Sequence, residues 1–177
     1  MSSDPLEMMF REFCLPTMAA HFAEMMASAE VQNWGYRKLL VQLCEAEGAD
    51  RRERKRERLL RESGLPTGKT LGNLEEGHLP AKVRRQLPTL LEGGFIERAE
   101  NLLVFGLPGR GKTHFLCALG RELVLRHACT VYFTPTFKLV QQLLTAKREL
   151  HLDKLLKKLD RYEAVIFRPQ VFEKKGR

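Results

Sequence analysis

A glycine-rich segment that ends in a lysine and a threonine is the part of the sequence best suited to chemistry. It follows a short apolar run, Leu102 to Phe105, and matches the pattern G-x-x-x-x-G-K-[ST] at every fixed position. Its residues are Gly106, Leu107, Pro108, Gly109, Arg110, Gly111, Lys112 and Thr113. Glycines let the backbone curl so that successive N–H groups face one centre, and the curl forms a binding site for an anion.

This pattern predicts a site for ATP and Mg²⁺. A helix that begins near Lys112 points the positive end of its dipole at the same anion. We expect the Lys112 ammonium to reach the β- and γ-phosphates and the Thr113 hydroxyl to ligate the Mg²⁺ ion. The alternative is a glycine-rich turn between a strand and a helix that binds no ligand. A second Gly-Lys-Thr, at 68–70, has Ser63 where the pattern requires a glycine, so it predicts no phosphate site.

The basic run from Arg51 to Arg58 is the second group of residues suited to binding. In a helix, four of its basic side chains share one face, because they lie at positions i, i+3, i+4 and i+7. These four are Arg51, Arg54, Lys55 and Arg58. Such a stripe predicts contact with the phosphate backbone of DNA, without preference for a base sequence. The alternative is a solvent-exposed face stabilised by pairs such as Glu57 with Arg61, and the run alone favours neither.

The composition narrows the classes of partner. The 177 residues carry a net charge of +8, which favours nucleic acid over an anionic membrane as the partner. No apolar stretch approaches the ~20 residues of a membrane-spanning helix, and the N-terminus has no signal-peptide core. The 4 cysteines are scattered, which favours reduced thiols and a cytoplasmic location. The histidines have no metal-ligand spacing, and we predict no zinc site.

The elements that position these residues predict an α/β fold preceded by a helical subdomain. Apolar residues at helical spacing predict helices over residues 4–62, broken at Leu15-Pro16 with a new cap at Thr17. Strands are expected at 102–105, 130–133 and 164–167. Strands that alternate with helices indicate a parallel sheet, here of about three strands. The expected domains are a DNA-binding helical subdomain at 1–64, a linker at 65–79 and a phosphate-binding domain at 80–177.

Beyond the glycine-rich loop, the chain resembles the IstB-type transposition helper ATPases, relatives of the DnaC helicase loaders in the AAA+ class. The similar blocks are Leu15 to Ala19, Phe95 to Asn101, Gly111 to His114 and Leu139 to Leu144. The resemblance implies a Walker A loop on an AAA+ P-loop sheet that binds ATP and Mg²⁺, and a DNA-binding N-terminal domain. It also implies homo-oligomers on DNA and a transposase as partner. DNA contact by the basic run is thereby favoured.

The chain departs from this family after the third expected strand, where the family carries the two acidic residues of Walker B. Alignment places Arg168 and Pro169 at those positions, and Glu163 lies ~16 Å too early along the strand to replace them. The family's last two strands, sensor residue and arginine finger have no counterpart before Arg177. We therefore interpret the chain as truncated, with a frameshift as one explanation of its basic tail. Truncation disfavours oligomers.

Three functions follow from these expectations. The first is an ATP- and DNA-binding helper of transposition. The second is a remnant that retains only nucleotide or DNA binding, and the third is a DNA-binding helical module with a vestigial loop. Without the Walker B acids we expect no catalytic residues and disfavour hydrolysis, so the assignment as an enzyme stays open.

Overall fold

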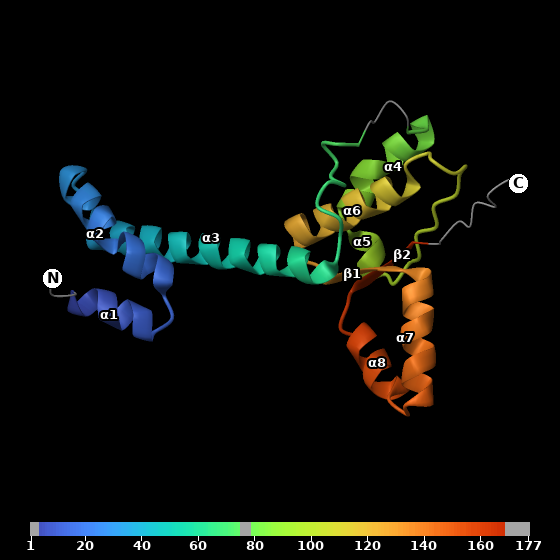
Figure 1. Ribbon diagram of the computed structural model, residues 1–177. Coiled ribbons are helices and arrows are strands. Elements are labelled where there is room, and N and C mark those ends of the chain that lie inside the picture. The colour runs from blue at the N-terminus through green and yellow to red at the C-terminus, as the bar shows by residue number, and fades with distance from the viewer. Residues whose placement is uncertain (1–3, 75–78, 169–177) are drawn as a thin grey trace, which may run out of the picture. The chain divides into compact units, whose positions relative to one another are not determined.

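The computed structural model describes residues 4–74 and 79–168 of the chain (Figure 1). Its elements, in chain order, are α1 (Pro5–Glu12), α2 (Pro16–Val31), α3 (Tyr36–Ser63), α4 (Ala81–Leu91), α5 (Gly94–Glu97), α6 (Lys112–His127), β1 (Val131–Pro135), α7 (Thr136–Arg148), α8 (Leu152–Leu159) and β2 (Ala164–Arg168). The chain divides into two compact units, Met1–Lys55 and Arg56–Arg177, and α3 contributes residues to both. In the described ranges, no helix is long and apolar enough to cross a membrane.

The first unit is helical, and α1 packs against α2 through an aromatic contact. Asp4 caps α1, since its carboxylate accepts the Leu6 N–H at 2.8 Å. Phe10 and the buried Phe22 meet edge to face, with their ring centroids 5.7 Å apart. The break between the two helices lies where the sequence predicts it, because α2 begins at Pro16.

The cap expected at Thr17 is wrong. Leu15 occupies the N-cap position of α2 and makes no side-chain capping bond, and Thr17 lies inside the first turn. The Thr17 N–H donates to Glu47 of α3 at 2.9 Å, and its hydroxyl donates to Asp50 at 2.7 Å. The start of α2 is therefore capped by another helix, a long-range contact that the local sequence pattern does not encode.

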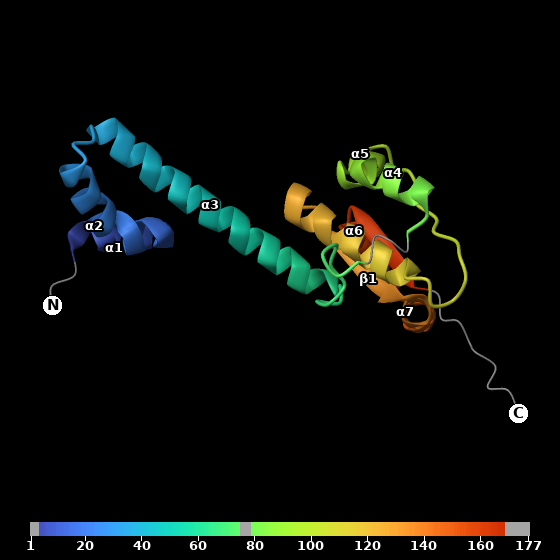
Figure 2. The same cartoon turned by 90° about the horizontal axis from the view of Figure 1, so that it is seen from above.

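The second unit contains a parallel sheet of β1 and β2, which α6 covers (Figure 2). The register runs from Val131 opposite Ala164 to Pro135 opposite Arg168. The buried face of α6 consists of Phe115, Cys117, Ala118, Leu119, Gly120, Leu123 and Val124. A Cβ on Gly120 would lie 2.5 Å from Cδ1 of Ile166. Glycine at this position therefore lets α6 approach β2 closely, and the unit has the expected α/β fold with an incomplete parallel sheet.

The strand expected at 102–105 is not formed, so the described sheet has two strands instead of about three. Leu102 and Val104 pack against the core of the second unit. Leu103 and Phe105 are 73% and 85% exposed. This alternation is typical of a half-buried strand, but no strand of the described residues pairs with the segment. An apolar run without a partner for its backbone N–H and C=O groups does not become a strand.

Candidate functional site

The loop before α6 holds three glycines in backbone conformations that other residues rarely adopt. Gly106, Gly109 and Gly111 have φ angles of 154°, 76° and 75°. Gly111 is the N-cap of α6, so the helix begins at Lys112, where the motif predicts it. The N–H groups of a first helical turn have no acceptor within their helix, and they lie at the positive end of its dipole. The end of this loop is therefore suited to an anion.

The Lys112 side chain lies across this loop. Its Nζ donates to the carbonyl oxygens of Gly106 and Leu107, at 2.8 and 2.6 Å. Both acceptors are neutral, and no carboxylate of the described residues pairs with the ammonium. The half-buried Thr113 has a hydroxyl without a hydrogen bond to any described residue. A positive charge without a counter-ion and an unused hydroxyl beside it fit a phosphate group and its metal ion.

A hollow of about 360 Å³ adjoins the loop. Gly109, Arg110, Gly111 and His114 line it from the loop and α6, and Asn73, Leu74 and Leu79 line it from the segment before α4. The His114 Nε2–H donates to the Thr70 carbonyl oxygen at 2.9 Å, which ties that segment to the start of α6. The sequence predicts only a linker here, at 65–79.

The carboxyl end of β2 carries a positive charge where the resemblance described above leads us to expect acidic residues. Arg168 is the last residue of the strand and is exposed, while Pro169 lies outside the described residues. Glu163 precedes the strand at its other end and accepts the Thr130 N–H and hydroxyl at 2.7 and 2.8 Å. In the parts of the chain that the structure covers, no three His, Cys, Asp or Glu residues form a group that could hold a metal ion.

Two of the four residues predicted to bind DNA are tied to acidic side chains of the first unit. The Arg51 Nε donates to Glu47 at 2.8 Å, and its Nη2 donates to the Cys14 carbonyl oxygen. Arg54 lies 2.9 Å from Asp50 and 3.5 Å from Glu47. The Arg51 guanidinium therefore joins α3 to the turn between α1 and α2, whereas Arg54 pairs with two carboxylates of its own helix; both guanidinium groups remain partly exposed.

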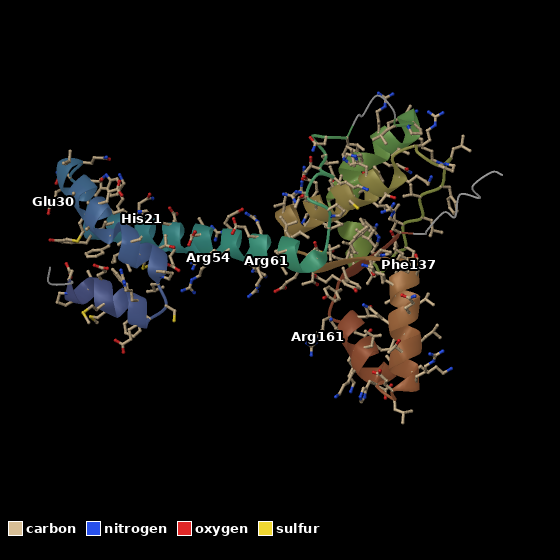
Figure 3. All side chains as sticks on the ribbon, in the orientation of Figure 1. His21, Glu30, Arg54, Arg61, Phe137 and Arg161 are labelled. Atoms are coloured by element: carbon tan, nitrogen blue, oxygen red, sulfur yellow. The ribbon has the colours of Figure 1, made fainter. Side chains whose placement is uncertain are left out.

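Lys55 and Arg58 complete the stripe, and both are exposed. Arg58 lies 4.0 Å from Glu62, which is the limit of an ion pair, and no described acidic residue pairs with Lys55. Basic side chains such as Arg54 and Arg61 project from α3 (Figure 3). The structure thus places the four predicted residues on one helix, but only Lys55 and Arg58 have little or no structural bonding.

Buried Glu47 accepts hydrogen bonds from three directions. Besides Arg51, the backbone N–H groups of Thr17 and Met18 donate to its carboxylate, at 2.9 and 3.3 Å. Burial raises the pKa of this carboxyl, but the bonds from Arg51, Met18 and Thr17 outweigh burial, so the pKa lies below its usual value. Glu47 is thus ionised and is the central acceptor of the first unit.

Comparison with known protein families matches residues 9–170 to the family described as IstB-like ATP binding protein. An insertion-sequence ATP-binding protein of Sinorhizobium fredii is 34% identical over 162 residues, which is 91% of this chain and 54% of the relative. The IS5376 ATP-binding protein of Geobacillus stearothermophilus is 36% identical over 82% of the chain and 59% of its own length. The IS21 ATP-binding protein of Pseudomonas aeruginosa is 30% identical over 87% and 58%. The chain thus spans little more than half the length of these relatives.

Proposed function

The chain belongs to the family of IstB-like ATP-binding proteins, and on this premise we propose that it binds ATP and Mg²⁺ through the loop Gly106–Thr113 as a helper protein of DNA transposition. The loop itself carries the proposal, since three glycines with positive φ lead into α6 and Lys112 lies across them. The names of the relatives, which are insertion-sequence ATP-binding proteins, support both the nucleotide and the process.

Phosphate binding requires Lys112 to exchange its acceptors. The ammonium leaves the neutral carbonyl oxygens of Gly106 and Leu107 for charged phosphate oxygens, which are stronger acceptors. The Thr113 hydroxyl is the group of this chain that would hold Mg²⁺, which neutralises charge between the β- and γ-phosphates when bound. The first turn of α6 then supplies backbone N–H groups to the same phosphates.

The hollow beside the loop takes the nucleoside part of the ligand in this proposal. It shares Gly109, Arg110 and Gly111 with the phosphate loop, and it also has an apolar wall of Leu74 and Leu79. A flat base needs such an apolar wall together with a few polar groups, which Asn73 and His114 offer.

DNA is the second ligand in the proposal, and it contacts the exposed face of α3 in the helical subdomain 1–64. Lys55 and Arg58 are its main contacts, because Arg51 and Arg54 are already paired with the carboxylates of Glu47 and Asp50. In the arrangement we propose, a linker at 65–79 joins this subdomain to the nucleotide domain at 80–177. A transposase is the protein partner, by analogy with the insertion-sequence relatives.

Titration of ATP into the full chain tests nucleotide binding, with Mg²⁺ and with a chelator, in the wild type and in Lys112→Ala. We expect saturable binding by the wild type and about ten- to hundredfold weaker binding by Lys112→Ala, because one charge-assisted hydrogen-bonding group is lost. Removal of Mg²⁺ is expected to weaken binding to the wild type.

Lys82→Ala is the matched control, since Lys82 is an exposed lysine of α4 outside the loop. Its affinity for ATP is expected to equal that of the wild type. Equal affinity of Lys112→Ala and the wild type, in protein with an unchanged circular dichroism spectrum, would refute the assignment of the loop.

A further inference from the structure

A groove between α7 and α8 has a charge pattern that the proposed function does not explain. The two helices pack against each other and are joined by a short turn at 149–151 (Figure 1). A hollow of about 560 Å³ is lined by residues of both helices and of the turn between them. Its basic and amide-bearing lining residues are Lys138, Gln141, Gln142, His151, Lys154 and Lys158.

The lining residues come from one face of each helix. Lys138, Gln142 and Thr145 follow one another at helical spacing on α7, and Lys154 and Lys158 are one turn apart on α8. Leu155 forms part of the apolar floor. Three ammonium groups from two helices therefore converge on one hollow, whereas a simple amphipathic helix would spread them over solvent.

The ammonium groups of the groove have no counter-ions. Within the described ranges, the side chains of Lys138, Lys154 and Lys158 form no ion pair or hydrogen bond, and Glu149 is the one acidic residue of the lining. Segment 136–161 carries seven lysines and arginines against three acidic residues. The basic run of α3 differs, since acidic side chains one turn away pair with Arg51, Arg54 and Arg58.

We infer that the groove between α7 and α8 binds the phosphate backbone of DNA, as a contact separate from that of α3. Unpaired lysines act as point charges for phosphate, and the amides of Gln141 and Gln142 donate hydrogen bonds to phosphate or sugar oxygens. DNA is favoured over other polyanions because the relatives are proteins of insertion sequences, so this inference rests on the proposed function. The contact lends affinity without sequence preference, because ammonium groups do not distinguish bases.

The test measures binding of the full chain to a fluorescent DNA duplex of mixed sequence over a series of salt concentrations. The variant Lys138→Gln/Lys154→Gln/Lys158→Gln removes the three ammonium groups and keeps side chains of similar length. Each lost phosphate contact reduces the slope of log K against log salt by about 0.9, so we expect a slope flatter by about two to three units. The three residues are exposed, so thermal unfolding is expected to be unchanged.

Three further measurements separate the effect of this groove from that of net charge and from the proposed function. Lys82→Gln/Arg84→Gln/Arg85→Gln removes the same charge from the exposed face of α4, and its slope is expected to stay near that of the wild type. Lys55→Gln/Arg58→Gln reports on α3 alone, and ATP titration reports on the loop alone. If the α3 variant does not change DNA binding, or if the loop does not bind ATP, the result for the groove still holds.

Equal slopes for the groove variant and the α4 variant would overturn the inference, since the effect would then be that of net charge. Absence of DNA binding by the wild type at low salt would overturn it as well. Binding of poly-glutamate through the same three lysines, without binding of DNA, would assign the groove to an acidic protein segment and would also refute the inference.

Discussion

Glu47 shows how much of the first unit depends on one carboxylate. It caps α2 through the N–H groups of Thr17 and Met18, and it holds Arg51 on its own helix. Loss of its charge leaves those donors with a weaker acceptor inside a buried site, where an unmet hydrogen bond is costly. The folded carboxyl has a lowered pKa, so ionisation of Glu47 and folding of the unit favour each other.

We predict that Glu47→Gln destabilises the first unit by about 1–3 kcal/mol at neutral pH. Because the folded pKa is lowered, the stabilisation by Glu47 is complete above the ordinary value of 4.5 and is lost as the pH falls through the folded pKa. The difference in stability between wild type and variant should therefore shrink in acid. Trp34 is the sole tryptophan of the chain, so its fluorescence during denaturant unfolding follows this unit.

Glu45→Gln is the control, because Glu45 is an exposed acid of the same helix. Its unfolding midpoint is expected to match that of the wild type. A difference between wild type and Glu47→Gln that stays constant down to acidic pH would contradict the role of the charge.

At the scale of elements, α3 combines structural residues and the residues that we propose to bind DNA on one face. The Arg51 and Arg54 side chains are bonded to Glu47 and Asp50, whereas Lys55 extends into solvent. A variant that replaces the whole stripe would mix loss of folding with loss of DNA contacts. The two pairs of residues therefore have to be changed separately.

We predict that Lys55→Gln/Arg58→Gln flattens the salt dependence of DNA binding by about two units and leaves the Trp34 unfolding midpoint unchanged. Arg51→Gln/Arg54→Gln is expected to lower that midpoint, since it removes the bond from Arg51 to the Cys14 carbonyl and leaves the carboxylates of Glu47 and Asp50 without their ion pairs. An unchanged salt slope in Lys55→Gln/Arg58→Gln would contradict this prediction. It would show that the basic run from Arg51 to Arg58 is a solvent-exposed face that does not contact DNA.

The sequence predicts elements well where the signal is local. The start of α6 after Gly111 follows from the glycine motif, and β1 and β2 follow from short apolar runs between helices. Prediction from the sequence fails where a contact with a residue distant in the sequence determines the local structure. The run 102–105 has the pattern of a strand but no paired strand in the described residues, and Thr17 has the residue type of a cap but donates to Glu47 instead.

The candidate site likewise has one part that the sequence predicts and parts that it does not predict. The glycine-rich loop is recognisable from sequence, because the backbone geometry that the proposed phosphate site needs follows directly from the spacing of its glycines. The hollow beside it and the groove between α7 and α8 are not, because each gathers residues from separate segments. Lys138 and Gln142 on one helix, with Lys154 and Lys158 on the next, each lie at helical spacing, and this is the signal that indicates the groove in advance.

At the scale of the whole molecule, the groups needed for nucleotide binding differ from those needed for hydrolysis. The proposed loop supplies positive charge to the phosphates, but hydrolysis also requires an acidic side chain near the metal ion to orient the attacking water. In the described chain, the strand end where the sequence resemblance leads us to expect that acid carries Arg168. A guanidinium there repels Mg²⁺ instead of holding its water shell.

We therefore predict that the full chain binds ATP without hydrolysing it. Phosphate release, measured with Mg²⁺ and DNA duplex present, is expected to equal that of Lys112→Ala at the same protein concentration. Because removal of the activating groups of a phosphoryl-transfer site costs about 10³-fold or more in rate, any retained catalysis would stand well above this background. Phosphate release by the wild type at ten times the rate of Lys112→Ala would contradict this prediction. It would show that the chain hydrolyses ATP and that another of its acidic residues holds the metal ion.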